Sequence, residues 1–188
     1  MRLKQSGSSL VEMTVSMALG MLCLGAIMMG ASNLIFMSKA AREGSHLAEG
    51  VTAMDSYLRT NGRSIIVNGT APGFPNPYQP TAAQLKAGNF LSSFVSNATP
   101  FDGALQFTVR HGTGNDLLGL VCDTQTITQS GQPSPQLAAE VVMAAKGTGL
   151  RTSIAQPGVL NGPGQVGIVS PINGPSIVCA WAYLPAPV

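Results

Sequence analysis

An acidic residue lies at the start of a long apolar stretch. Glu12 is followed by 25 residues, Met13 to Met37, that contain no Lys, Arg, Asp or Glu. A carboxylate at the centre of a membrane costs about 3 kcal/mol, and less near the surface, so such residues mark functional positions. A buried carboxylate is stabilised by a cationic partner, because each charge alone is costly to desolvate. Glu12 is therefore a candidate for ion pairing.

The three cysteines are the next candidates for chemistry. Cys23 lies inside the apolar stretch and is interpreted as a small apolar helix residue. Cys122 and Cys179 lie 57 residues apart in the polar remainder of the chain. In an oxidising compartment these two are the natural disulfide pair, and closing so long a loop would stabilise the fold by about 4 kcal/mol. Two buried thiols are the alternative.

Other reactive residue types form no convincing site. His46 and His111 have no Cys or His at metal-ligand spacing, so both are expected on the solvated surface. A catalytic triad could be written from Asp102, His111 and a serine, but nothing in the sequence sets their geometry. We therefore expect no enzymatic activity, no metal and no cofactor.

A glycine motif near the C-terminus is also set aside. The residues from Gly162 to Gly167 match the dinucleotide-binding pattern, which requires a preceding strand and a following helix. Pro163 and the prolines at 171 and 175 are incompatible with that helix. The motif is therefore predicted to be a turn.

Charge is sparse and evenly spread. Only 10% of residues are charged, and from Ser38 onward eight Lys or Arg residues face seven Asp or Glu. A nucleic-acid groove needs clustered Lys and Arg. The composition therefore argues against a nucleic-acid partner.

The N-terminal segment has two general interpretations. A secretory signal peptide has an apolar core of about 7–15 residues, whereas this stretch is longer and includes Glu12 near its start. A plain membrane anchor fits the length, because Leu10 to Met37 would span about 42 Å as a helix and a bilayer core is about 30 Å thick. Arg2 and Lys4 would then stay in the cytoplasm, with the C-terminal part outside. An anchor alone does not explain Glu12.

The segment from Gly7 to Gly30 resembles the N-terminal signature of type IV prepilins. A short basic leader, Met1 to Gly7, is followed by Ser-Ser-Leu-Val-Glu-Met, which places Glu12 fifth after the glycine. The family usually has Phe or Met at the position of Ser8. The resemblance implies cleavage by a prepilin peptidase between Gly7 and Ser8, and N-methylation of the new amine at Ser8.

The same resemblance assigns a role to Glu12. In the family, the Glu of an incoming subunit is thought to neutralise the N-terminal amine of a neighbour. Glu12 would thus set the axial register of a polymer. Small residues at four-residue spacing, Ser16 with Gly20 and Ala26 with Gly30, would allow close helix approach; ordinary membrane-helix composition is the alternative explanation for them.

Periodicity predicts the elements that carry these residues. Apolar residues at spacings of three and four indicate a helix from about 10 to 60 that ends near Asn61-Gly62. Its apolar face carries Leu47, Val51, Met54 and Leu58, and the charged residues Arg42, Glu43, Glu49 and Asp55 are placed off that face.

The rest of the chain reads as short elements joined by loops. Thr81 with Gln84 predicts a capped helix over 82–87, and Ser134-Pro135 predicts another that extends to about 146. Alternation predicts strands over 105–110, 117–124 and 177–184. The Gly- and Pro-rich loops 68–80 and 156–175 are candidates for contact with partners.

These expectations combine into an α+β fold, with a long N-terminal helical spine packed on an antiparallel sheet. Residues 1–7 form the leader, 8–37 the transmembrane and assembly segment, and 38–188 the soluble domain with the outer half of the helix. Residues 80–150 also show a diffuse resemblance to minor pilins of conjugative thin pili, the type IVb group.

The resemblance implies a minor pilin subunit that polymerises through its N-terminal helix into a surface fibre for adhesion, motility or conjugative contact. Its partners would be other pilin subunits, the prepilin peptidase and, before assembly, the bacterial inner membrane. The alternative is a pseudopilin of a type II secretion system. A DNA-uptake pilin and an uncleaved single-pass membrane protein are further options.

Overall fold

The chain divides into two compact units, Met1–Phe36 and Met37–Val188. The computed structural model describes residues 8–112 and 114–186, and the side chains of residues 8–12 and 23–30 in the first helix lie outside this description. That helix, α1 (Ser8–Asn68), contributes residues to both units. Its sequence suits a helix, because no proline occurs before Pro72 and Ala, Leu and Met are good helix formers.

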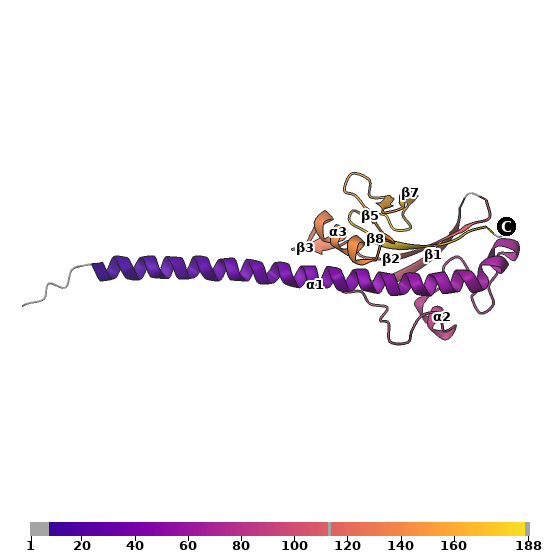
Figure 1. The fold of residues 1–188 in the computed structure, drawn as a ribbon, viewed down its shortest axis with the longest axis horizontal. Coiled ribbons are helices and arrows are strands. Elements are labelled where there is room, and N and C mark those ends of the chain that lie inside the picture. The colour runs from indigo at the N-terminus through magenta and orange to yellow at the C-terminus, as the bar shows by residue number, and fades with distance from the viewer. Residues whose placement is uncertain (1–7, 113, 187–188) are drawn as a thin grey trace, which may run out of the picture. The chain divides into compact units, whose positions relative to one another are not determined.

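The second unit contains the sheet (Figure 1). Six antiparallel strands are arranged in the order β1-β2-β8-β5-β6-β7. The hairpin of β1 and β2 lies at one side, and the C-terminal strand β8 joins it to the rest. The strands are β1 (Leu105–His111), β2 (Leu117–Asp123), β5 (Gly149–Thr152), β6 (Val159–Gly162), β7 (Gln165–Val169) and β8 (Val178–Leu184).

One face of this sheet packs on α1. The buried helix face begins at Ala40 and includes Leu47, Met54 and Leu58. The approach is close: a Cβ atom on Gly50 would lie 2.7 Å from Val121 Cγ1 in β2. Since successive side chains of a strand point to opposite faces, the alternate residues of β2 and β8 are left to form a second core.

The second core lies on the other face, where the sheet curls. Leu120 of β2, Leu150 of β5 and Leu160 of β6 are fully buried together. The two edge strands also meet here, because the guanidinium Nη1 of Arg110 in β1 donates to the carbonyl oxygen of Val169 in β7 at 2.6 Å. The sheet is thus closed upon itself by side chains and buries apolar residues on both faces.

Two short helices follow local sequence rules. α2 (Ala82–Ala87) has a complete capping box between Thr81 and Gln84, and α3 (Pro135–Ala144) begins with Pro135 after the N-cap Ser134. Both predicted helices are therefore confirmed. A two-stranded hairpin, β3 (Thr128–Gln129) and β4 (Gln132–Pro133), precedes α3.

Neither edge strand of the large sheet offers a regular, fully open backbone edge. On β1, the backbone N–H of Val109 donates to the carbonyl of Tyr78 at 2.7 Å, so the loop before α2 covers part of that edge. On β7, the pairing with β6 is irregular, and Gly167 has φ +76° with its N–H bonded to the side chain of Asn161.

The predicted spine arrangement is wrong, and only the coarser α+β class holds. A single long helical spine packed on the sheet is not observed, because residues up to Phe36 belong to a separate unit and buried helix residues begin at Ala40. The sheet meets only the part of the helix after that point. The larger feature of the second unit is a curled six-stranded sheet with a core of its own.

Further boundaries also differ from the prediction. α1 continues through Asn61-Gly62 to Asn68. Gly62 serves helix packing and does not mark a helix end. A Cβ atom at this position would overlap the side chain of Leu184, so only glycine allows this close contact. Glu43 was placed off the buried face, yet it is fully buried. The Gly162–Gly167 turn is confirmed as the β6–β7 hairpin, whose strands the sequence did not predict.

The contact between α1 and α3 predicts a sharp effect of one methyl group. A Cβ atom on Gly44 would overlap Ala144 Cβ and lie 2.6 Å from the backbone oxygen of Val141. Gly44→Ala should therefore lower the free energy of unfolding of the second unit by about 1–3 kcal/mol. Thermal unfolding followed by near-UV circular dichroism checks this. Gly20→Ala is the control, since nothing lies within 4 Å of its new Cβ, and equal stability of the two variants would contradict the packing.

Candidate functional site

The described residues of the first unit form an exposed apolar helix surface. Eight large apolar side chains, Met13, Val15, Met17, Leu19, Met21, Leu22, Leu34 and Ile35, are each more than half exposed. At about 100° per residue, these positions point in all directions around the helix. A helix that is apolar all round belongs in the core of a large protein or in a membrane. This surface is therefore a candidate site of contact with lipid or with neighbouring helices.

No helix among the described residues is long and apolar enough to count as a membrane-crossing segment.

The predicted cleavage and register residues fall where the description ends. Gly7 lies outside the described residues, and Ser8 and Glu12 belong to α1 while their side chains lie outside the description. Cleavage between Gly7 and Ser8, methylation of Ser8 and pairing by Glu12 stay predictions.

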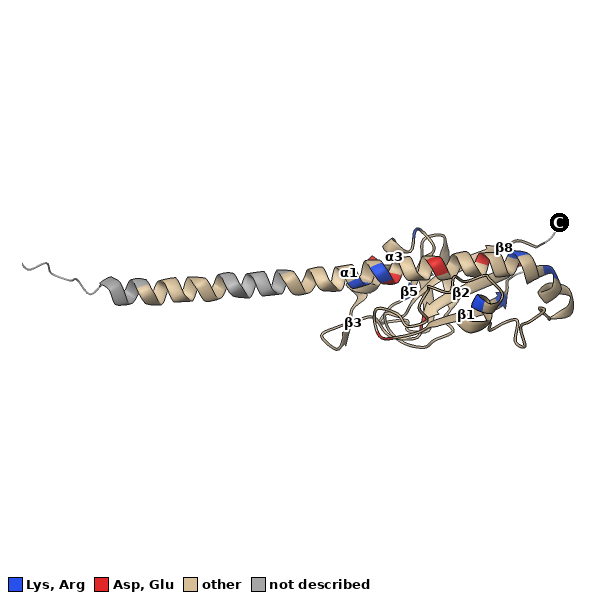
Figure 2. Cartoon of the chain, turned by 90° about the horizontal axis from the view of Figure 1, so that it is seen from below, with Lys and Arg blue, Asp and Glu red and all other residues tan. Residues whose placement is uncertain are grey.

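Charged residues are absent from the described apolar segment and dispersed elsewhere. Figure 2 shows blue and red residues interspersed along the rest of α1 and over the sheet, beginning with Lys39. One surface ion pair, Arg59 to Asp55 at 2.7 Å, links successive turns of α1. The hydrogen bond and charge of Asp55 raise the pKa of the exposed Arg59 guanidinium, which keeps its positive charge in any case.

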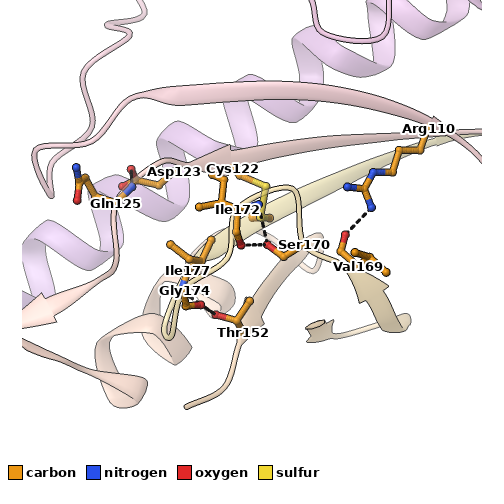
Figure 3. The surroundings of a disulfide bond; sticks show 11 residues. Arg110, Cys122, Asp123, Gln125, Thr152, Val169, Ser170, Ile172, Gly174 and Ile177 are labelled. Atoms are coloured by element: carbon orange, nitrogen blue, oxygen red, sulfur yellow. Dashed lines mark hydrogen bonds between the residues drawn. A yellow bond between two sulfur atoms is a disulfide. The ribbon is translucent and has the colours of Figure 1, made fainter. Parts of the chain in front are cut away.

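A disulfide joins Cys122 and Cys179, the pair that the sequence favours (Figure 3). The two residues are directly opposite each other in the ladder between β2 and β8. Both are fully buried in the second core, with Ile177 and the partly buried Trp181 packed around them. Since β2 and β8 are the central link between the hairpin and the rest of the sheet, the bond fixes their register covalently.

The histidines have separate surroundings. The imidazole Nε2 of His111 lies 3.2 Å from the hydroxyl oxygen of Tyr78 on the exposed end of β1. His46 is half-buried and both ring nitrogens are buried without a hydrogen-bond partner, so its predicted solvated position is wrong. Among the described residues, no group of three or more His, Cys, Asp or Glu side chains is placed to hold a metal ion.

A buried acidic pair is the feature that the sequence prediction missed. Glu43 of α1 and Asp123 of β2 are both 0% exposed. Burial, with a smaller effect from the negative charge of Asp123, raises the pKa of Glu43 to about 8. Glu43 lies four residues before Leu47, so extending the apolar periodicity backward would have placed it on the buried face.

The loop predicted to make contacts lines an open pocket. Pro72, Gly73 and Phe74 face Phe90 and the polar side chains of Asn61 and Gln84 across it. Phe74 and Phe90 also form an aromatic cluster with the buried Tyr57, whose ring centroid lies 4.7 Å from that of Phe74. The second predicted loop, 156–175, is instead largely made of β6, β7 and their connections.

Comparison of the chain with protein-family models, with curated proteins and with solved structures finds no match.

The disulfide predicts both a thiol count and a loss of stability. Since Cys122 and Cys179 are joined, the denatured, unreduced protein should expose one reactive thiol, that of Cys23. Because the bond closes a separation of 57 residues, the Cys122→Ser, Cys179→Ser double variant should lose about 4 kcal/mol of unfolding free energy. Thiol titration and chemical denaturation measure these two quantities. Cys23→Ser is the control and should keep the stability, whereas three titratable thiols in the exported protein would contradict the bond.

Proposed function

We propose that this chain is a type IV pilin-like subunit, cut after Gly7 and assembled through residues 8–37 into a surface fibre for adhesion, motility or conjugative contact. A minor rather than a major subunit is proposed. It acts by assembly and contact, without enzymatic chemistry. Its partners are other pilin subunits, the prepilin peptidase and, before assembly, the inner membrane.

The observation that carries this proposal is the spacing of Glu12. It is the fifth residue after Gly7 and precedes 25 residues without a charged side chain. In a plain membrane anchor this carboxylate would destabilise the inserted helix and would have no function. In a cleaved chain it has a partner, because removal of the leader creates a free α-amino group at Ser8 that is mostly cationic at neutral pH.

The exposed apolar helix surface supports the same proposal. Met13, Leu19 and Met21 point to different sides of α1 and are 57–73% exposed, so cover is required on all sides. Contiguous exposed apolar area of this kind marks protein or membrane contact. Lipid before assembly and neighbouring helices after it would cover the surface in turn.

The topology proposed before assembly follows from charge. Arg2 and Lys4 precede the apolar stretch, so the N-terminus would stay in the cytoplasm and residues 38–188 would face the periplasm. That compartment is oxidising, and the buried Cys122–Cys179 disulfide fits it. The C-terminal unit would then be carried outward on the fibre.

A pseudopilin of a type II secretion system is the second candidate, since it would share the N-terminal signature. The family's major pseudopilin typically has a calcium site near its C-terminus. No Asp or Glu occurs after Ile154 in this chain, which favours the pilus subunit over that version. Electron microscopy of purified surface fibres, with antibody labelling of this chain, separates the two assignments.

Cleavage is the first test. Expressed with a prepilin peptidase, the mature protein should lose residues 1–7 and begin at Ser8, as measured by intact mass and N-terminal sequencing. Gly7→Leu should block the cut, because the leader that this chain resembles ends in Gly, while Ser6→Ala serves as the control and should be processed. Retention of Met1 to Gly7 in the wild-type chain with active peptidase would reduce the protein to an uncleaved anchor.

The second test concerns Glu12. Glu12→Ala should leave the protein cleaved and in the membrane but reduce its incorporation into fibres by tenfold or more, because the buried amine of Ser8 loses its partner. Thr14→Ala, two residues further along the same helix, should assemble normally. Quantitative immunoblotting of sheared fibres measures both. Normal fibres from Glu12→Ala would refute the register role.

A further inference from the structure

The contact between α1 and β2 contains an acid without partners. Glu43 is 0% exposed, and neither oxygen of its side chain has a hydrogen-bond partner. A buried ionised carboxylate without partners is strongly unfavourable, and such a group instead takes up a proton. The packed state of this helix turn therefore favours neutral Glu43.

The residue that opposes ionisation lies at the end of β2. Asp123 is also 0% exposed, and its charge contributes to the raised pKa of Glu43. Unlike Glu43, Asp123 is held: Thr99 Oγ1 donates to Oδ2 at 2.8 Å and the backbone N–H of Gln125 donates to Oδ1 at 2.9 Å. Burial raises the pKa of Asp123, while these two hydrogen bonds and His46 act to lower it.

The remaining charged groups do not neutralise the pair. His46, one turn along α1, lowers the pKa of Asp123. Asp102, from the loop before β1, raises it. From α3, which packs on the same turn through Gly44, the charged side chain is the half-buried Glu140. The pKa of Glu43 responds to burial and to Asp123.

The turn that carries Glu43 cannot adjust while it stays packed. The next residue, Gly44, lies so close to α3 that even a Cβ atom would overlap Ala144, and Leu47 is 1% exposed. An ionised Glu43 can reach water only if this turn moves. An open pocket lined by Arg42, His46 and Pro100 lies on the same stretch of α1.

We propose that the contact between residues 40–50 of α1 and the end of β2 is a proton-sensitive latch, closed while the Glu43–Asp123 pair holds a proton and loosened when both carboxyl groups ionise. The latch acts within the second unit and is independent of the assembly function.

The direction of the pH effect follows from linkage. The pKa of Glu43 in the folded chain is about 8, above its ordinary value of 4.5, so the folded state binds the proton more tightly than the open state. The stabilisation of the closed turn is therefore complete below about pH 4.5 and is lost as the pH rises toward and through 8. Alkaline conditions open the latch.

Hydrogen exchange of the full chain in a non-ionic detergent tests this. After correction for intrinsic exchange rates, protection of the amides of residues 40–50 should fall by tenfold or more between pH 6 and pH 9, while the amides of β8 keep their protection. Glu43→Gln should abolish that fall, because the amide cannot ionise. Glu49→Gln, an exposed acid on the same helix, is the matched control and should retain it.

A second variant keeps the test decisive if Glu43→Gln fails to fold. Asp123→Asn retains an oxygen for the Thr99 bond and removes the opposing charge, so the fall in protection should become smaller. The latch is refuted if wild-type protection of residues 40–50 is independent of pH, if Glu43→Gln shows the wild-type slope, or if β8 loses protection in parallel.

Discussion

The close approach of α1 to the sheet is the constraint on which the second unit depends. Gly44 faces α3, Gly50 faces Val121 of β2, and Gly119 of β2 lies against Met54, each at a distance that excludes a Cβ atom. Glycine in a helix or strand interior costs about 1 kcal/mol in propensity, and this cost is offset because close approach lets Met54 and Leu58 become fully buried. The same tight packing encloses Glu43 without partners.

The two units have opposite relations to water. In the second unit, α1 presents one face to the sheet and its other positions to solvent, as is usual for a helix of a globular protein. In the first unit the described part of α1 has no charged side chain and carries exposed apolar side chains on every side. Exposed apolar area of this kind is unfavourable in water unless another surface covers it. The proposed assembly role would supply that cover, and the disulfide supports the second unit independently of it.

Local chemistry was predictable from the sequence and long-range pairing was not. The capping box of α2 and the N-cap serine and proline of α3 act within four residues, so Thr81 and Ser134 marked both helices correctly. β5, β6 and β7 are only four or five residues long and each contains a glycine, so they show no clear alternation of apolar and polar residues. The pairing of β5 with β8 is also distant in the sequence. Gly62 was wrongly interpreted as a helix end. Its role is to allow contact with Leu184, and residues near Gly62 in the sequence give no sign of that contact. For the candidate site, the spacing of Gly7 and Glu12 is legible in the sequence, whereas burial of Glu43 and Asp123 depends on the fold.

The partly covered β1 edge and the irregular β7 edge affect how the sheet can interact with neighbouring chains at high concentration. An open edge strand offers unpaired backbone groups to any neighbouring chain, and proteins block such edges to avoid fusing into larger sheets. Here the carbonyl of Tyr78 occupies part of the β1 edge, and the irregularity around Gly167 distorts β7. Copies held side by side at high local concentration would therefore keep their sheets separate. Edge-to-edge pairing, the first step toward amyloid-like aggregation, is thereby disfavoured.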